Sequence, residues 1–338
     1  MSSVRELARE LGLSHTTVSD ALRNKPKVKK ETRERVLDAA RKAGYRYNPL
    51  AGALMSEMRR SSVGVFQGVL AVVDLECPEK RVKAAALYHK QISEGCREKA
   101  LELGFKAELF VMGSELLTVS RLDTILNSRG IRGVILLPAS TEPDISNLGW
   151  EKFAGIYTDY IIQRPALDTV CSDHFRSMVV ALNKLKELGY KRPGFVLDSL
   201  HDERLLCRWE AAFRMHCLKD SGTQAPAPYV TNDLNEEGFR KWYAREKPDV
   251  VLCHKMRVFH WMENMGLNIP EQVGFCCLNT HMSEEPVSGL DLCPRTIGSR
   301  ATELLVGQLH RNDYGVPEFA STTTIPAVWV DGPTTRQQ

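Results

Sequence analysis

The sequence predicts a small all-α domain at the N-terminus and, after it, an α/β core of two doubly wound subdomains with parallel sheets. Three observations lead to this expectation. Positive charge lies at one end, since residues 1–60 hold 14 Lys and Arg against 7 Asp and Glu, whereas residues 61–338 hold 31 against 35. Apolar residues near the N-terminus recur with a helical period, and beyond residue 68 short apolar runs alternate with amphipathic stretches. At 338 residues, the chain is long enough for two or three domains.

The first 43 residues are expected to form two short helices and a supporting third. Residues 4–11 carry an apolar stripe, Gly12 ends that helix, and Ser14 is suited to cap the next one. The third helix is expected from Lys30 to Ala43. The residues predicted to face inward are Val4, Leu7, Ala8, Leu11, Val18, Ala21, Leu22, Val36, Leu37 and Ala40. Two helices joined by a tight turn, with a third behind them, are typical of a helix-turn-helix.

The second of these helices is expected to present His15, Thr16, Thr17 and Asp20 outward, where such a helix enters the major groove of DNA. Asp20 is unusual in this place. A carboxylate can accept a hydrogen bond from cytosine N4, but phosphates and the acceptor-rich edge of guanine repel it. We therefore expect Asp20 to change the preferred DNA sequence and not to abolish DNA binding.

Several short motifs extend this pattern, namely Leu13-Ser14, Thr17-Val18-Ser19, Glu31 to Val36, Gly44-Tyr45 and Asn48. With them, residues 4–54 resemble, nearly end to end, the DNA-binding headpiece of the LacI/GalR repressor family. The resemblance implies base contacts by His15, Thr16 and Asp20 and phosphate contacts by other polar side chains. The full expected DNA-binding set is Ser14, His15, Thr16, Thr17, Asp20, Lys25, Thr32, Arg33, Tyr45, Asn48, Ala51 and Leu54. The alternative is a three-helix bundle with a solvated basic face.

Residues 48–61 are expected to form a hinge between the headpiece (residues 1–47) and the core. Asn48 can cap a short helix and Pro49 suits its first turn, but the segment contains Gly52 and is too short to be stable alone. The resemblance implies that two such helices from a dimer lie in the minor groove, where Leu54 is wedged between base pairs and Ala51 allows the helices to approach. An ordinary flexible linker is the alternative.

The remainder, residues 62–338, contains eight predicted strands, at 68–75, 107–112, 133–138, 155–159, 169–172, 193–198, 249–253 and 274–279. Predicted helices cover residues 82–103, 174–188, 202–218 and 295–311. This alternation indicates parallel sheets covered by helices on both faces. The resemblance implies a periplasmic-binding-protein-like core whose chain crosses between subdomains near residues 159–165, 285–292 and 318–324. The first subdomain would then hold residues 62–160 and 290–320, and the second residues 161–289 and 321–338.

Ligands of such sheets bind beyond the carboxyl ends of the strands, so a cleft between the two subdomains is the expected effector site. Several groups that fix sugars in the family are replaced here, by Trp209, by Asn279 and by His254-Lys255. The remaining candidates for the cleft are Asp159, Tyr160, Asp173, Arg204, Trp209 and Asn279. Trp209 could instead fill the core, and Asp173 could cap a helix.

The sequence therefore predicts a homodimeric, sequence-specific DNA-binding repressor. Its expected partners are a palindromic operator of double-stranded DNA and a sugar or related metabolite. A regulator of the same fold whose cleft has lost its effector is the main alternative. An enzyme is disfavoured because no Walker loop, Gly-x-Gly-x-x-Gly fingerprint or Gly-x-Ser-x-Gly elbow is present, so no catalytic residues are assigned. Nine cysteines without ligand spacing predict reduced thiols, no metal and no cofactor. The absence of an apolar run of roughly 18 residues and of an export signal predicts a cytoplasmic protein that contacts no membrane.

Overall fold

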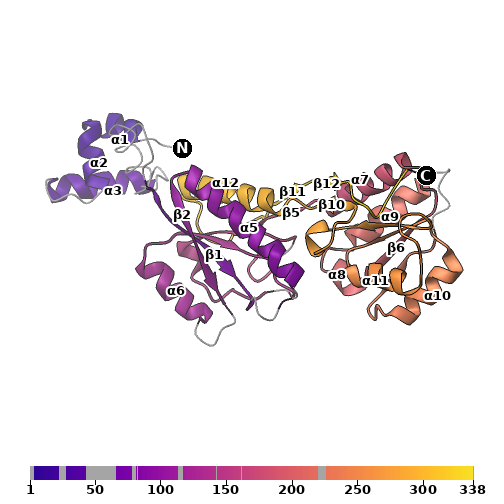
Figure 1. Ribbon diagram of the computed structural model, residues 1–338. Helices are drawn as coiled ribbons and strands as arrows, with labels where there is room; N and C mark the ends of the chain where they lie inside the picture. The colour runs from indigo at the N-terminus through magenta and orange to yellow at the C-terminus, as the bar shows by residue number, and fades with distance from the viewer. Residues whose placement is uncertain are drawn as a thin grey trace. The chain divides into compact units, whose positions relative to one another are not determined.

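The computed structural model divides the chain into two compact units, residues 1–67 with 307–313, and residues 68–306 with 314–338 (Figure 1). Within them the structure describes residues 4–22, 28–42, 66–77, 81, 83–112, 117–141, 143–160, 162–219 and 226–337. The predicted hinge at 48–61 lies outside the described residues. We call the first unit the headpiece unit and the second the core unit.

The headpiece contains the three predicted helices, α1 (Val4–Leu11), α2 (His15–Leu22) and α3 (Lys30–Lys42). Gly12 ends α1 with a φ of +64°, a backbone conformation that favours glycine, and Leu13 then donates its N–H to the carbonyl of Ala8 at 3.0 Å. Ser14 caps α2 as predicted, since its Oγ accepts a hydrogen bond from the Thr17 N–H at 3.1 Å. The helix-turn-helix is thus built by the local signals that predicted it.

The buried faces of the three helices enclose a small apolar core that includes Leu7, Val18 and Val36, each without exposed surface. Two expectations for side chains in this unit are wrong. Leu37, expected inward, is 40% exposed, and Asp20, expected outward, is only 6% exposed. The reason for Asp20 is that α1 and α3 both pack against α2, so the covered part of α2 is wider than one apolar stripe.

The first sheet of the core unit has six parallel strands in the order β11-β5-β4-β3-β1-β2. The strands are β1 (Gly68–Asp74), β2 (Phe105–Val111), β3 (Gly133–Leu136), β4 (Ala154–Tyr157), β5 (Asp168–Ser172) and β11 (Thr322–Ile325). Helices α5 (Lys83–Glu102), α6 (Val119–Ser128) and α12 (Pro294–Arg311) and the 3-10 turn η2 (Trp150–Lys152) accompany it. Ala71 and Val73 pack with Leu122 of α6, while Val72 between them faces α5, so helices cover both faces as predicted.

Helices α5 and α12 touch through their backbones at two glycines. A Cβ atom on Gly95 would lie 2.1 Å from the carbonyl oxygen of Arg295, and one on Gly298 would lie 2.0 Å from that of Ile92. No other residue type fits without moving one helix. The crossing is reinforced by Arg295, which forms ion pairs with Glu94 and Glu98 of α5.

The second sheet has the order β12-β10-β9-β8-β6-β7, with β12 antiparallel to β10 and the other pairs parallel. Its strands are β6 (Pro193–Asp198), β7 (Tyr229–Thr231), β8 (Val250–Cys253), β9 (Gly274–Cys277), β10 (Gly289–Asp291) and β12 (Val328–Val330). Its helical elements are α7 (His174–Glu187), α8 (Ser199–Glu203), α9 (Arg208–Lys219), α10 (Glu236–Glu246), α11 (Met256–Asn264) and the 3-10 turn η3 (Thr280–Met282).

The chain changes sheets at three places, and two of these differ from the prediction. Strand β5 pairs with β4 and β11, so the first crossing lies between β5 and α7, later than 159–165. The second lies between β10 and α12, and the third between β11 and β12, just beyond 318–324. The predicted subdomain boundaries therefore assigned β5 and β11 to the wrong sheet.

The helix predicted over 202–218 is interrupted. Leu206 and Cys207 adopt φ values of 54° and 55°, which no α-helix accommodates, and α9 restarts at Arg208. Asp202 organises this break, because its carboxylate accepts hydrogen bonds from the N–H groups of Trp209 at 3.1 Å and Glu210 at 3.0 Å.

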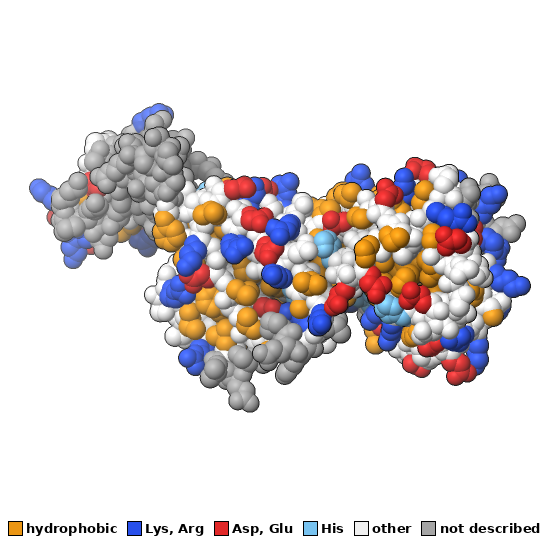
Figure 2. Space-filling view, viewed as in Figure 1, with side chains coloured by type: hydrophobic (Ala, Val, Ile, Leu, Met, Phe, Trp, Pro, Cys, Tyr) orange, Lys and Arg blue, Asp and Glu red, His pale blue; other side chains and the backbone are white. Residues whose placement is uncertain are grey.

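The visible face of the core unit carries Lys and Arg side chains interspersed with Asp and Glu (Figure 2). Such mixing differs from a single-sign surface that would attract a polyanion. Across the described ranges, no helix combines the length and apolar character that a membrane crossing requires.

Candidate functional site

The predicted DNA-binding side chains fall into two groups. Ser14 is exposed, Thr17, Thr32 and Arg33 are partly exposed, and Asp20 is buried. His15 and Thr16 begin α2, but their side chains lie outside what the structure describes, as do the residues Lys25, Tyr45, Asn48, Ala51 and Leu54.

Polar side chains of α2 and α3 are engaged within the headpiece. The hydroxyls of Ser14 and Thr17 lie 2.8 Å apart, Arg33 Nη2 donates to the Val28 carbonyl at 3.1 Å, and Arg35 Nη2 donates to the Leu11 carbonyl at 2.6 Å. Asp20 also interacts with other groups of the chain. The Ser14 hydroxyl therefore holds the first turn of α2, and the Arg35 contact joins α3 to the end of α1.

The core unit contains a cavity of about 460 Å³ at the carboxyl ends of both sheets. This volume lies within the roughly 300–1,000 Å³ of ordinary ligand pockets. Residues after β3, β4 and β5 of the first sheet, and after β6, β8 and β9 of the second, line it. Both subdomains therefore contribute to one site, at the strand ends where doubly wound sheets bind ligands.

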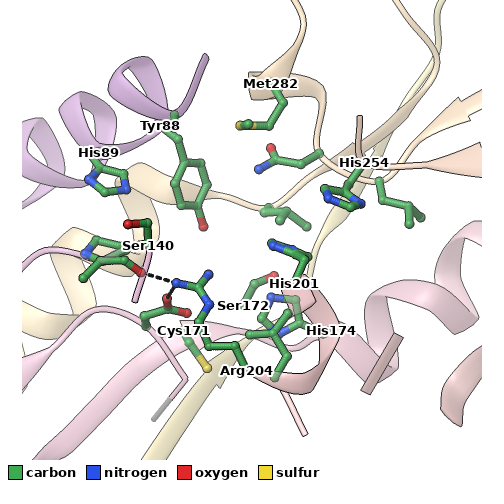
Figure 3. A pocket seen from close by; sticks show the side chains of 18 of the residues that line it. Tyr88, His89, Ser140, Cys171, Ser172, His174, His201, Arg204, His254 and Met282 are labelled. Atoms are coloured by element: carbon green, nitrogen blue, oxygen red, sulfur yellow. Dashed lines mark hydrogen bonds and ion pairs between the residues drawn. The ribbon is translucent and has the colours of Figure 1, made fainter. Parts of the chain in front are cut away.

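The charged groups in the cavity wall are paired with one another. Arg204 forms an ion pair with Asp159 at 3.3 Å and also donates to the Ala139 carbonyl (Figure 3). Lys255 lies 3.3 Å from Asp198. Arg81 is held by Asp74 through two hydrogen bonds and lies 3.4 Å from a carboxylate oxygen of Glu76. Glu76 in turn accepts the N–H of Ser140 at 2.6 Å, which ties the loop after β1 to the loop after β3.

Four histidines line the same cavity. His201 and His254 stack with their ring centroids 4.3 Å apart, and the labelled side chains in Figure 3 place His89 on the opposite side, with the Tyr88 hydroxyl pointing between them. The His174 ring packs against the edge of Trp209 with centroids 5.2 Å apart.

Burial keeps these imidazoles neutral. It lowers the pKa of His89 and of His174 to about 4 and that of His201 to about 3. It also lowers the pKa of His254 well below 6.5, with a further contribution from the neighbouring His201. At neutral pH each ring therefore offers one N–H donor and one nitrogen acceptor.

Many polar atoms of this cavity lack a partner. Among the described residues that line the cavity, six buried side-chain nitrogen or oxygen atoms have no hydrogen bond within the protein. These six are His89 Nδ1, Ser172 Oγ, His174 Nδ1, Asp198 Oδ1, His254 Nδ1 and His254 Nε2. Because a buried polar group without a partner costs about 1–3 kcal/mol, their concentration at one site indicates a place built for polar contacts.

Four of the six predicted cleft residues line this cavity, namely Asp159, Arg204, Trp209 and Asn279. Trp209 is 1% exposed and also belongs to the apolar core, so it fills the core as well as forming part of the wall. Tyr160 and Asp173 are not in the wall. Tyr160 is buried, and the guanidinium of Arg208 lies 4.1 Å from its ring centroid. Asp173 caps α7 by accepting the Arg176 N–H at 3.0 Å, which was the alternative interpretation.

The sequence analysis did not select most of the residues that give the cavity its chemistry, in particular His89, Ser172, His201 and Asp198. One signal was available. Ser172 and Asp198 end buried strands, and His254 directly follows one, so their place at the carboxyl ends of parallel strands could have been inferred. His89 sits in the middle of α5, where no such rule points to it. Asp173 and His174 are adjacent in the sequence but have separate roles, since Asp173 caps a helix and His174 packs on Trp209.

Comparisons with known proteins agree with this architecture. The family described as bacterial regulatory proteins, lacI family, matches residues 3–48, and the periplasmic binding protein-like domain matches residues 182–335. The transcriptional repressor CytR of Escherichia coli (strain K12) is 23% identical over 333 residues, which cover 93% of this chain and 92% of CytR.

Two solved structures share the fold over nearly the whole chain. A complex of the transcriptional regulator CelR with cellobiose matches with a TM-score of 0.57 and 18% identity, covering 99% of this chain and 100% of CelR. The lac repressor dimer bound to operator and the anti-inducer ONPF matches with a TM-score of 0.54 and 16% identity, covering 99% of each chain. With a lacI-type helix-turn-helix at its N-terminus and a periplasmic-binding-protein-like core behind it, the chain belongs to the LacI/GalR family of DNA-binding transcription regulators.

Proposed function

We propose that the protein is a repressor that binds a palindromic operator as a homodimer, and that a small molecule in the core cavity controls this binding. The observation that carries the proposal is the pairing of a helix-turn-helix with a cavity whose unpaired polar atoms come from both subdomains. A ligand that contacts both subdomains binds one of their relative arrangements better and so shifts the population toward it. The lac repressor structure that shares this fold is a dimer bound to operator DNA, which supports both the dimer and the operator in this proposal.

A regulator without an effector is the second candidate, favoured by the replacement of family ligand groups at Trp209 and Asn279. The unpaired atoms of the cavity favour an effector, because they place donors and acceptors from both subdomains around one site. An enzyme gains no support, since the charged groups of the cavity are engaged with one another.

The decisive experiment selects the preferred operator from random DNA and then measures operator affinity in the presence of metabolites. We expect a two-fold symmetric site, because protein symmetry is mirrored in the operator. Binding to all duplexes alike at low salt, by a protein that stays monomeric, would contradict the proposal.

Asp20→Ala tests the role of the buried carboxylate. Because Asp20 is only 6% exposed and interacts with other groups of the chain, we expect the operator selected by this variant to stay the same; a change at one base position of each half-site would show that the carboxylate reads a base after all. Selection and sequencing of bound DNA measure this. An unchanged operator, together with a lower melting temperature of the headpiece, would show that Asp20 only positions α2, as its 6% exposure allows.

Leu54→Ala tests the proposed minor-groove wedge. Operator binding should weaken by more than about 1 kcal/mol, because the side chain that unstacks the central base pairs is lost. Binding to non-specific DNA should hardly change, since it depends on phosphate contacts. Fluorescence anisotropy with both DNAs gives the comparison, and equal losses on the two would reject the wedge.

A further inference from the structure

The cavity residues also indicate what kind of ligand the site accepts, an inference that rests on the proposed function. We propose that the site selects an uncharged ligand rich in hydrogen-bond donors and acceptors, contacted by His254, Asp198 and His174 from the second subdomain and by His89 and Ser172 from the first. Phosphorylated or carboxylated forms of that ligand are excluded. Sugars and nucleosides both have this chemistry, and the experiment below separates them.

The first argument is the balance of charge. The cavity wall contains three cations, Arg81, Arg204 and Lys255, and three carboxylates, Glu76, Asp159 and Asp198. Each cation lies within 3.4 Å of a carboxylate oxygen, so none is available to neutralise an anionic ligand. An anion would have to break one of these pairs in a buried site, which is costly.

The second argument is the chemistry of the unpaired atoms. Five of the six are imidazole nitrogens or a hydroxyl oxygen, groups that donate or accept without carrying charge in this cavity. The sixth, Asp198 Oδ1, is a carboxylate oxygen and can only accept. It therefore requires a donor such as a hydroxyl or an amide, which an ionised phosphate does not offer.

The third argument is the position of these atoms. Asp198 and His254 lie at the ends of neighbouring strands β6 and β8, whereas Ser172 ends β5 in the other sheet and His89 belongs to α5. A ligand that satisfies both sets must therefore reach across the cavity. In Figure 3, His254 and His201 lie across the cavity from His89, and the side chain of Tyr88 lies between them.

The test uses the full-length protein at neutral pH and calorimetry with three matched pairs of probes. The pairs are ribose and ribose phosphate, glucose and gluconate, and adenosine and adenosine monophosphate. We expect at least one neutral probe to bind and its anionic counterpart to bind at least about tenfold more weakly. An anionic probe that binds as tightly as its neutral counterpart, or silence of all neutral probes, overturns the inference.

Substitutions of His254 test whether the neutral probe binds in the cavity. For the neutral probe that binds, His254→Leu should weaken affinity by about tenfold or more, and His254→Gln, which keeps a donor and an acceptor, should recover part of the loss. His260→Gln is the control, because His260 is on α11 with a half-exposed side chain and pairs with Glu263 outside the cavity. Equal affinity of His254→Leu and wild type would overturn the role of His254.

Asp159→Asn provides an independent test of the charge argument. This change leaves Arg204 without its carboxylate partner, so the discrimination against the anionic probe should fall by about tenfold. Unchanged discrimination would overturn the argument from charge. Operator binding of each preparation is measured without probe, so that loss of sequence preference on DNA, which refutes the proposed function, is distinguished from failure of the ligand inference alone.

Discussion

Lowering the pH from about 8 to about 5 will destabilise the core unit by several kcal/mol, because the cavity buries neutral imidazoles that become charged on unfolding. The pKa of His174 is lowered from 6.5 to about 4, and that of His254 is lowered well below 6.5. A group with a depressed pKa binds more protons in the unfolded chain than in the fold, so stability falls as the pH drops below 6.5 and continues to fall toward 4. His174 alone accounts for about 2 kcal/mol at pH 5, since each pKa unit is worth about 1.4 kcal/mol.

Urea unfolding followed by tryptophan fluorescence measures this effect in the core unit, because all five tryptophans lie between residues 150 and 329. His174→Phe and His254→Phe should each flatten the pH dependence of the unfolding free energy relative to the unsubstituted protein. The variants should be compared above pH 5. Burial raises the pKa of Asp202, so protonation of this carboxylate stabilises the folded state as the pH falls further and would oppose the effect of the histidines. Stability that is constant between pH 8 and pH 5 would contradict neutral buried histidines.

Trp209→Ala should cost about 3–5 kcal/mol of unfolding free energy, the range for removing a large buried aromatic side chain. Trp209 is 1% exposed, packs against His174 and lies in the cluster that joins α7, α9 and the second sheet. The indole also covers His174, so its removal should admit water and return the pKa of that imidazole toward 6.5. The variant is therefore expected to lose stability at pH 8 and to show a weaker further loss at pH 5.

Two comparisons distinguish this result from a general effect of losing a tryptophan. Trp209→Phe keeps an aromatic ring against His174 and should therefore lose less unfolding free energy than Trp209→Ala. Trp329→Ala removes a partly exposed indole that donates to Asp331 at 2.7 Å, and its loss should be smaller still. Thermal and urea unfolding of the three variants rank them. Equal losses for Trp209→Ala and Trp329→Ala would show that burial of Trp209 does not determine the stability of this region.

The sequence predicted those parts of the fold that depend on local signals. The stripe in residues 4–11, the cap at Ser14 and the apolar runs of the central strands all correspond to observed elements. Strands β7, β10, β11 and β12 were missed because three or four residues with mixed burial give little periodic signal. Their pairing with distant strands, and not their own sequence, makes them strands.

The candidate site was predictable in location but less so in chemistry. The rule that doubly wound sheets bind ligands at the carboxyl ends of their strands predicted the place of the cavity, and Asp159 and Arg204, selected as cleft candidates, do line it. The prediction for Tyr160 failed because the bend that follows β4 places its side chain in the core beside Arg208. The histidines were overlooked because a lone histidine has no characteristic spacing, and only the fold brings four of them to one cavity.

The glycine contact between α5 and α12 has a consequence for synthesis of the protein on the ribosome. Strand β5 ends at Ser172, but α12 extends from Pro294 to Arg311, so about 140 further residues must be made, over roughly 7–28 s at typical rates, before the whole of α12 can pack against α5. During that interval the surface of α5 around Gly95 is not covered by α12, and β5 is not yet paired with β11. The first subdomain therefore remains incomplete on the ribosome while the second is translated. During this period its uncovered surfaces are most accessible to chaperones and to misassembly.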